Sequence, residues 1–178
     1  MQKTLLLESL CEQLQQEINA TRSAVDEAHA LASHEQSKPE NQYDTLALEA
    51  AYLAHGQSER IAELQRQLLV LNHFEFVKLT QDQPILVGSL VCLVDLELNE
   101  NQWLWILPVA GGKVLSAAIA HVDQLKNINT INTNELNTIR SITPTAPLAK
   151  VMLGKYVDDV ISLNMGGKKK QFEVIELL

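Results

Sequence analysis

Two long runs of the chain place apolar residues at the alternating steps of four and three that are typical of a coiled-coil helix. The first seam consists of Leu7, Cys11, Leu14, Ile18, Thr21, Val25, Ala28 and Ala32. The second seam consists of Tyr43, Ala47, Ala50, Ala54, Gln57, Ile61, Leu64, Leu68 and Leu71. Pro39 lies between the runs, and proline interrupts a helix because it lacks the N–H donor and clashes with the preceding turn. The pattern predicts two helices of similar length.

The sizes of the seam side chains predict how the two helices run. They shrink from leucine to alanine along the first helix and grow from alanine to leucine along the second. Folding the chain back at about residue 38 places large side chains against large ones and small against small, as close packing requires. We therefore expect residues 1–76 to form an antiparallel coiled-coil hairpin. Its seam is satisfied within one chain, so a monomer is the expected state.

The turn of this hairpin carries a cluster of polar residues. Glu35 and Glu40 flank Pro39, and either Asn41 or Asp44 can cap the second helix. One interpretation is a solvated turn, with acidic residues near the N-terminus of a helix. The other is that this turn is the functional end of the molecule.

Several apolar residues lie off the seam of the second helix, close to the turn. A thin two-helix rod has no other core in which to bury them, so they indicate docking of this half of the hairpin against another protein. These residues are Leu46, Leu48, Tyr52 and Leu53.

Residues 80–178 have the pattern of a small α+β domain. We expect a strand or bent pair of strands at 85–98, interrupted by Gly88, and further strands at 102–107, 113–120, 157–163 and 168–177. PLAKVML at 147–153 predicts a short helix with proline in its first turn. The polar segment 123–141, rich in Asn and Thr, predicts a surface loop or short irregular helix. The fold class is therefore α+β: a helical hairpin, then an antiparallel sheet with one helix.

Charge and composition narrow the choice of partner and compartment. The net charge is −8, and residues 1–78 hold six basic and twelve acidic side chains. This argues against wrapping duplex nucleic acid, which needs a basic surface. The three leucines before Glu8 are too short a run for a signal sequence or membrane span. We expect a cytoplasmic protein with no membrane contact, in which Cys11 and Cys92 are reduced thiols of the core.

Motifs for catalysis are missing from the sequence. AGGKVLS lacks the Ser or Thr of a phosphate loop, and the histidines lack the spacing of zinc ligands. Lys168, Lys169 and Lys170 follow two glycines and indicate a solvated turn. Trp103 and Trp105 share one face of a strand, where core packing is the preferred interpretation. We expect no nucleophile, no enzyme and no cofactor of its own.

The order of these elements, together with one C-terminal motif, resembles the GreA/GreB family of bacterial transcript cleavage factors. The match covers nearly the whole chain except the Asn-rich loop. It is most specific in TPTAPLAKVMLGKYVDDVISL, where the following residues fit the family pattern: Pro147, Leu148, Ala149, Lys150, Leu153, Gly154, Lys155, Asp159 and Val160.

The resemblance implies an FKBP-like C-terminal domain that docks on the rim of the secondary channel of RNA polymerase. The coiled coil then enters that channel, in indirect contact with nascent RNA and template DNA. The family docking turn reads Asp or Asn, then Ser, then Pro. This chain has Thr145, Ala146 and Pro147, so only the proline is retained.

At the tip, cleaving members of the family carry Asp-Leu-Lys-Glu-Asn, whose two carboxylates help to hold a magnesium ion shared with the polymerase. Glu40 and Asn41 match the end of this pattern, whereas Ser37 replaces the aspartate. One carboxylate holds magnesium poorly, because the ion keeps a nearly octahedral oxygen shell. Glu35 or Asp44 would have to move by several ångströms to substitute. Glu40 is thus the one metal-ligand candidate carried over.

Two functions from different classes follow. The first is a Gre-like regulator that binds RNA polymerase and modulates elongation or transcript cleavage. The alternative is an FKBP-like prolyl isomerase or chaperone that uses the coiled coil as an arm for client proteins, for which Trp103 and Trp105 would be the aromatic candidates.

Overall fold

The computed structural model describes residues 2–32, 46–77, 79–116 and 138–178. The chain divides into two compact units. The helical unit is Cys11–Asn72, and the sheet unit combines Met1–Leu10 with His73–Leu178. Within the described residues, neither long helix holds an apolar stretch long enough to cross a membrane.

The helical unit is built from helix α1, Gln2–Ala32, which begins in the sheet unit, and helix α2, Leu46–Asn72. Two contacts fix their direction. The Cys11 thiol lies 3.8 Å from the Asn72 side-chain oxygen, and Arg60 forms an ion pair with Glu17. A later residue of α1 therefore meets an earlier residue of α2. The predicted antiparallel hairpin is confirmed for these residues, whereas the predicted facing of Ala28 and Ala32 with Ala47 and Ala50 lies outside the described side chains.

The heptad seam of the helical unit is largely as predicted. Leu14, Ile18, Leu64 and Leu71 are fully buried. Half-buried seam residues are Thr21, Val25, Ala54, Gln57, Ile61 and Leu68. In the first turns of α1, Leu6 and Leu10 are fully buried, whereas the predicted seam residue Leu7 is only half-buried. The reason is that Met1–Leu10 belongs to the sheet unit, where a different face of the helix is buried.

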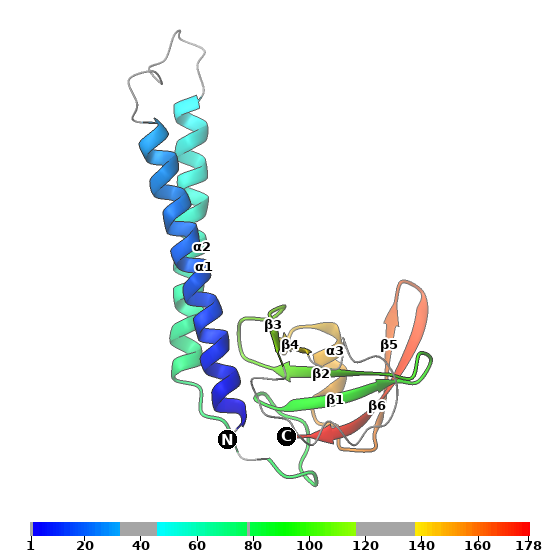
Figure 1. Ribbon diagram of the computed structural model, residues 1–178. Helices are drawn as coiled ribbons and strands as arrows, with labels where there is room; N and C mark the ends of the chain where they lie inside the picture. Colours follow the sequence, from blue (N-terminus) through cyan, green and yellow to red (C-terminus); the bar gives the residue numbers. More distant parts are fainter. Residues whose placement is uncertain (1, 33–45, 78, 117–137) are drawn as a thin grey trace. The chain divides into compact units, whose positions relative to one another are not determined.

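The sheet unit contains one six-stranded sheet with the order β3-β4-β2-β1-β6-β5 (Figure 1). Its strands are β1 Leu90–Asp95, β2 Glu100–Ile106, β3 Val114–Ser116, β4 Thr138–Ile142, β5 Val160–Met165 and β6 Lys168–Leu177. Helix α3, Pro147–Met152, connects β4 to β5. An α+β fold with an N-terminal helical hairpin is thus confirmed.

Two predictions about the sheet are wrong in detail. β2 and β4 pair in parallel, with Leu104 opposite Arg140, whereas the other four pairings are antiparallel. In addition, residues 138–141 belong to strand β4 rather than to a loop or irregular helix. β4 was hidden in the sequence because it is short and buries only alternate residues, Ile139 and Ser141. A parallel neighbour also needs a long crossover, which a sequence of short strands does not reveal.

The predicted strand at 85–98 is shorter than its apolar run. Gly88 has φ of +98°, a conformation that L side chains rarely adopt, and β1 begins two residues later. A Cβ atom at Gly88 would also lie 3.1 Å from the Phe74 ring. Glycine is therefore required here both by the turn and by the close approach of an aromatic side chain.

The sheet buries side chains on both faces. On one face, Val91, Leu104, Phe172 and Val174 form a cluster that Met152 of α3 joins, so α3 covers this face. On the opposite face, Trp105 stacks on Phe76 with ring centroids 5.5 Å apart. The preferred core interpretation of both tryptophans is confirmed, because Trp103 and Trp105 are buried.

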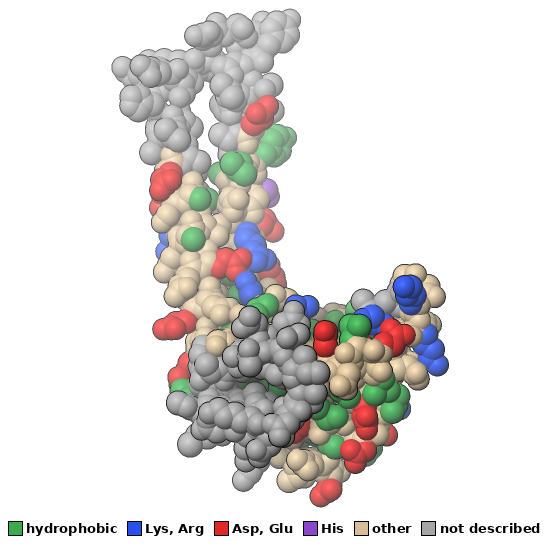
Figure 2. Space-filling view, turned by 45° about the vertical axis from the view of Figure 1, so that its right-hand side comes forward, with side chains coloured by type: hydrophobic (Ala, Val, Ile, Leu, Met, Phe, Trp, Pro, Cys, Tyr) green, Lys and Arg blue, Asp and Glu red, His purple; other side chains and the backbone are tan. Residues whose placement is uncertain are grey.

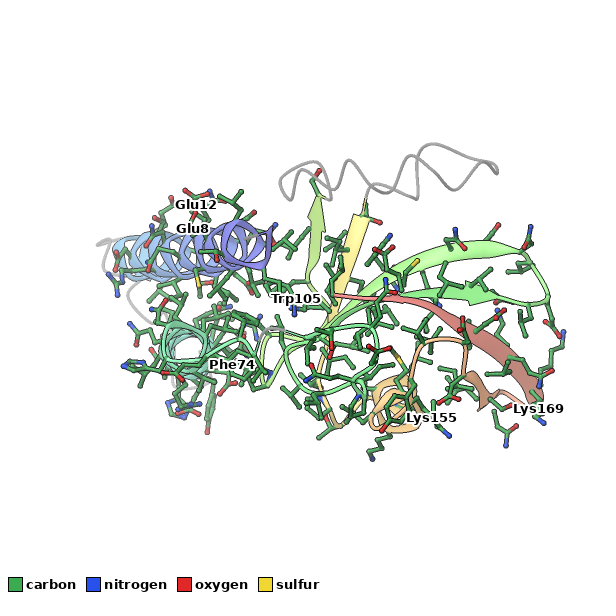
Figure 3. The ribbon with its side chains drawn as sticks, turned by 90° about the horizontal axis from the view of Figure 1, so that it is seen from below. Glu8, Glu12, Phe74, Trp105, Lys155 and Lys169 are labelled. Carbon is green, nitrogen blue, oxygen red and sulfur yellow. The ribbon has the colours of Figure 1, made fainter. Side chains whose placement is uncertain are left out.

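The aromatic stack includes a lysine. Phe74 packs edge-on against Phe76 with centroids 4.9 Å apart, and the Lys3 ammonium lies over the Phe76 ring at 6.0 Å. Burial lowers the pKa of Lys3 to about 8. Figure 3 shows Trp105 at one end of the sheet and Lys169 at the other, so this aromatic end is distant from the β5–β6 turn.

Candidate functional site

The residues predicted at the hairpin tip lie outside the described residues. They are Glu35, Ser37, Glu40, Asn41 and Asp44. Their roles, including Glu40 as a ligand of a shared magnesium ion, stay predictions. Within the described ranges, His, Cys, Asp and Glu side chains form no group of three or more that could hold a metal ion.

The predicted docking segment, Thr145 to Pro147, is a turn that leads into α3. The Ala146 N–H donates to the Thr143 carbonyl at 2.9 Å, and the hydroxyls of Thr143 and Thr145 share a hydrogen bond of 2.9 Å. Ala146 then precedes the helix with extended backbone, φ −62° and ψ 140°. The turn is therefore closed by its own residues before the helix begins.

Pro147 starts α3 because the first turn of a helix needs no N–H donor and prefers the φ that proline fixes. Pro147 and Thr145 are exposed, and Ala146 is half-exposed. The helix ends before Gly154, whose φ is +80° and whose N–H donates to the Ile85 carbonyl at 2.9 Å. The docking segment is thus exposed at the start of α3, and the end of this short helix is held by the hydrogen bond from Gly154 to Ile85.

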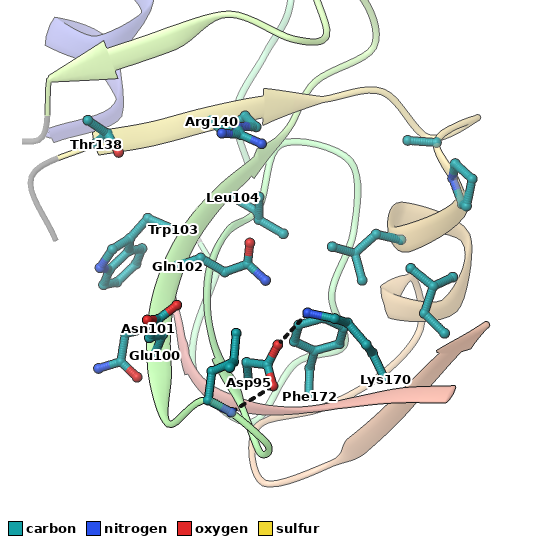
Figure 4. Close-up of a pocket in the computed structure, with 15 residues that line it drawn as sticks. Asp95, Glu100, Asn101, Gln102, Trp103, Leu104, Thr138, Arg140, Lys170 and Phe172 are labelled. Atoms are coloured by element: carbon teal, nitrogen blue, oxygen red, sulfur yellow. Dashed lines mark hydrogen bonds and ion pairs between the residues drawn. The ribbon is translucent and has the colours of Figure 1, made fainter. Parts of the chain in front are cut away.

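A pocket of about 580 Å³ opens beside this segment, at the end of the sheet face that α3 covers (Figure 4). Ala146, Pro147 and Leu148 form one wall, and Gln102 and Leu104 of β2 form another. The remaining lining residues are Asp95, Leu98, Glu100, Asn101, Trp103, Thr138, Arg140, Leu163, Lys170 and Phe172. The structure thus brings two of the three predicted docking residues, Ala146 and Pro147, to the edge of a cavity.

The bottom of the pocket is apolar and its rim is polar. Leu104 and Phe172 are buried, and Leu148 and Leu163 pack partly buried against the same core cluster. Gln102 projects from the same side of β2 as Leu104, whereas Trp103 projects from the other side (Figure 4). Such a site holds an apolar group at its bottom and orients it by polar contacts at its mouth.

An ion pair joins β1 and β6 at one edge of the pocket. The Lys170 ammonium donates to the Asp95 carboxylate at 3.1 Å, and the Asp95 side chain is 7% exposed. The other carboxylate oxygen accepts the N–H groups of Glu97 at 2.9 Å and Leu98 at 3.2 Å. Asp95 therefore closes the β1–β2 turn and also fixes Lys170.

These contacts decide the protonation of Asp95. Burial by itself raises the pKa of Asp95, but the hydrogen bonds from the Glu97 N–H, Lys170 and the Leu98 N–H outweigh it. The net effect is a pKa below the ordinary value, so Asp95 is a carboxylate at neutral pH. The sequence predicts a solvated turn for all three lysines, whereas in the structure Lys170 forms an ion pair with Asp95.

Sequence reasoning missed most of the pocket, including Gln102, Arg140 and Lys170. A weak signal was present in β2, which starts with three polar residues, Glu100, Asn101 and Gln102, and whose other end is wholly buried. Arg140 could not be placed because β4 was not predicted.

Two apolar residues of α2 that were predicted off the seam are exposed. Tyr52 is 69% exposed and Leu53 is 57% exposed. Figure 2 shows apolar side chains on the surface of the helical unit, among acidic and basic ones. The side chains of Leu46 and Leu48 are outside the described set. The exposure agrees with the pattern, and docking of this surface stays a prediction.

Both cysteines are free thiols. Cys92 is buried and Cys11 is half-buried. Burial, and secondarily the charge of Glu176 opposite it in the sheet, raises the pKa of Cys92 to about 12. Burial also raises the pKa of Cys11. Neither thiol is poised as a nucleophile, because the thiolate is the reactive form.

A comparison of the chain with protein-family models gave no match, and a comparison with curated proteins gave none either. Among solved structures, the chain is similar to Gfh1 of Thermus aquaticus, at 21% identity and a TM-score of 0.36, over 93% of this chain and 92% of that one. It is also similar to GreA factor homolog 1 of Thermus thermophilus, at 21% identity and a TM-score of 0.31, over 94% of each chain.

A third similar structure is the prokaryotic transcription elongation factor GreA/GreB of Nitrosomonas europaea, at 16% identity and a TM-score of 0.34. That similarity covers 74% of this chain and 92% of the other. TM-scores this low transfer no residue role to the chain.

Proposed function

We propose that this chain is a Gre-like transcription factor that binds RNA polymerase at the secondary channel, with an FKBP-like sheet unit that docks and a hairpin whose tip enters the channel. The supporting observation is the placement of the docking segment. In a chain whose PLAKVMLGKYVDDV stretch fits the family pattern, Thr145 to Pro147 are exposed or half-exposed, and the last two border a pocket.

The hairpin supports the same proposal from a different direction. Its antiparallel helices close their own seam, so the unit needs no second chain to bury its apolar residues. Tyr52 and Leu53 remain exposed on α2, where they offer contact area to a large partner.

Within this proposal, we favour modulation of the polymerase or competition for its channel over strong stimulation of cleavage. Ser37 stands where cleaving relatives carry an aspartate, so Glu40 would be a single carboxylate at a shared magnesium ion. One carboxylate gives weak coordination of an ion that retains most of its water shell.

Binding to purified bacterial core RNA polymerase tests the proposal. The full chain is expected to bind, and a variant lacking residues 34–45 is expected to bind more weakly because the tip contact is lost. Pro147→Ala is expected to weaken binding at the docking segment, whereas Pro84→Ala serves as a proline control that lies outside the segment and does not line the pocket. No binding of the full chain would overturn the proposal.

Stalled elongation complexes with backtracked RNA test the preferred mode of action. We expect the chain to leave the transcript length unchanged, or to slow shortening by a cleaving factor added with it. Rapid magnesium-dependent shortening that Glu40→Ala abolishes would overturn this preference while leaving polymerase binding intact.

One observation bears on the prolyl-isomerase alternative, namely that Trp103 and Phe172 both border the pocket, although the Trp103 ring projects from the other side of β2. Both are nearly buried, which leaves little aromatic surface for a proline ring. A peptide isomerisation assay that shows no rate increase removes this alternative.

A further inference from the structure

The pocket is sized for a side chain and its neighbours rather than for a whole element of secondary structure. Its volume of about 580 Å³ falls within the range in which proteins enclose small ligands or anchoring side chains. Leu104, Leu148 and Phe172 line its apolar part, and Leu98 at the mouth is 57% exposed. An occupant therefore gains most by burying one apolar side chain here.

One end of the pocket is acidic. Asp95 and Glu100 are directly opposite each other in the β1–β2 register, and Lys170 binds Asp95. Within the described residues, Glu100 forms no ion pair, and it is exposed. The Asp95–Lys170 pair is neutral in sum, so the unbalanced charge at this end is the Glu100 carboxylate.

The other end is basic. Arg140 of β4 is the register partner of Leu104 in the parallel β2–β4 pairing. It is exposed, and among the described side chains it has no acidic partner. The structure thus places a guanidinium beside the apolar part of the pocket, on the side away from Glu100.

Strand geometry gives the spacing between the two charges. Glu100 and Leu104 are four residues apart on β2, which corresponds to roughly 13 Å at the rise of an antiparallel or parallel strand. Gln102 lies between them, and Figure 4 shows it on the side of β2 that also carries Leu104. Its amide offers both a donor and an acceptor to the backbone of an occupant.

We propose that the pocket binds a segment of RNA polymerase in which one apolar side chain is flanked by an acidic residue, which pairs with Arg140, and by a basic residue, which pairs with Glu100. The proposal rests on the proposed function, because it takes the polymerase as the partner. The apolar anchor provides the contact, and the two opposite charges fix the direction in which the segment lies.

Arg140→Ala and Arg140→Glu test the proposal in binding titrations with purified core RNA polymerase at two salt concentrations. Arg140→Ala is expected to weaken binding roughly two- to fivefold, as for an exposed ion pair. Arg140→Glu is expected to weaken it by roughly tenfold or more, since it places like charges together. Both losses should shrink at high salt, because exposed charges are screened.

Lys169→Glu is the matched control. It makes the same change of charge on an exposed side chain at the far end of β6, and it does not line the pocket. Its affinity for the polymerase is expected to equal that of the unmodified chain. Thermal melting of each variant, with a midpoint like that of the unmodified chain, verifies that the sheet unit is folded.

The outcomes separate this inference from the proposed function. If the unmodified chain does not bind polymerase, both fail. If it binds and Pro147→Ala weakens binding while Arg140→Glu does not, the charge-directed pocket is wrong and the proposed function survives. Equal weakening by Arg140→Glu and Lys169→Glu would mean general charge attraction and would also overturn the inference.

Discussion

The helical unit and the sheet unit bury their apolar residues in different ways. Among the described side chains of the helical unit, four seam residues are fully buried, and the seam positions between them are only half-buried. The four are Leu14, Ile18, Leu64 and Leu71. In the sheet unit, both faces of the sheet are covered, and whole strands such as β1 are almost completely buried. We therefore expect the loss of one buried side chain to have a local effect in the seam of the hairpin, whereas a similar loss in the two-sided core should destabilise the whole sheet unit.

The largest effect is expected in the sheet core. Trp105→Ala removes a fully buried indole and its stacking on Phe76, so it should lower the free energy of unfolding by about 3–5 kcal/mol. Urea unfolding followed by the fluorescence of Trp103 measures the loss. Val160→Ala, at a half-exposed strand position, should change the free energy by less than about 0.5 kcal/mol. Equal losses in both variants would contradict a core role for Trp105.

In the helical unit, Leu64→Ala should cost about 2–3 kcal/mol, at the lower end of leucine-to-alanine losses, because a narrow seam relaxes around the gap. Far-UV circular dichroism during urea unfolding follows the helices. The matched control is Leu53→Ala on the same helix, where the side chain is mostly exposed and little change is expected. A larger loss at Leu53 than at Leu64 would mean that the seam is wrongly assigned.

The ion pairs of the two units also differ, but with smaller expected changes in the free energy of unfolding. Asp95→Ala should cost about 1.5–3 kcal/mol at neutral pH, because it removes hydrogen bonds to a charged, buried carboxylate from Lys170 and two backbone N–H groups. Lys170→Met should cost less, since the backbone donors remain. Urea midpoints at pH 7 measure both, and equal losses would show that the lysine is the main partner.

The pH dependence of this pair has a definite sign. Because the folded state lowers the pKa of Asp95 below its ordinary value of 3.8, Asp95 stabilises the protein above that pH. The stabilisation is lost as the pH falls through the lower, folded pKa. The acid limb of the stability profile should therefore be shallower in Asp95→Asn than in the unmodified chain.

The smallest effect is expected for the exposed pair between Glu17 and Arg60, whose side chains are 32% and 46% exposed. Arg60→Ala should cost about 0.2–1 kcal/mol at low salt, and the difference should disappear at high salt. A double-mutant cycle with Glu17→Gln isolates the pair energy. A coupling that persists at high salt would show that this contact is less solvated than its exposure indicates.

The sequence predicts the hairpin better than the sheet because a helix seam repeats. Each seam residue indicates the same buried face of its helix, as Leu14, Ile18, Ile61 and Leu64 do. The trend in side-chain size along the seams then predicts that the two helices are antiparallel. Strands β1 and β6 were also recognisable from β-branched residues. β4 was not, since Thr138, Arg140 and Ser141 are polar and only its neighbours in space explain why the segment is extended.

The candidate site divides in the same way. Pro147 could be predicted from a local motif, because proline at the start of a helix is a local preference. Arg140, Gln102 and Lys170 line the same pocket only because β2 pairs with β4 and β1 pairs with β6, and the strands of each pair are far apart in the sequence. The spacing of these residues along the chain does not indicate that they lie close together, so the pocket could be found only from the structure.

The position of β6 has a consequence for synthesis of the protein. β6 lies between β1 and β5 in the sheet and follows both of them in the sequence. While the nascent chain emerges, the backbone groups of β1 that pair with β6 have no hydrogen-bond partner until about eighty further residues have been translated. Ribosome-bound intermediates would thus expose a hydrophobic strand edge to chaperones. The helices, whose partners are near in sequence, can associate long before that moment.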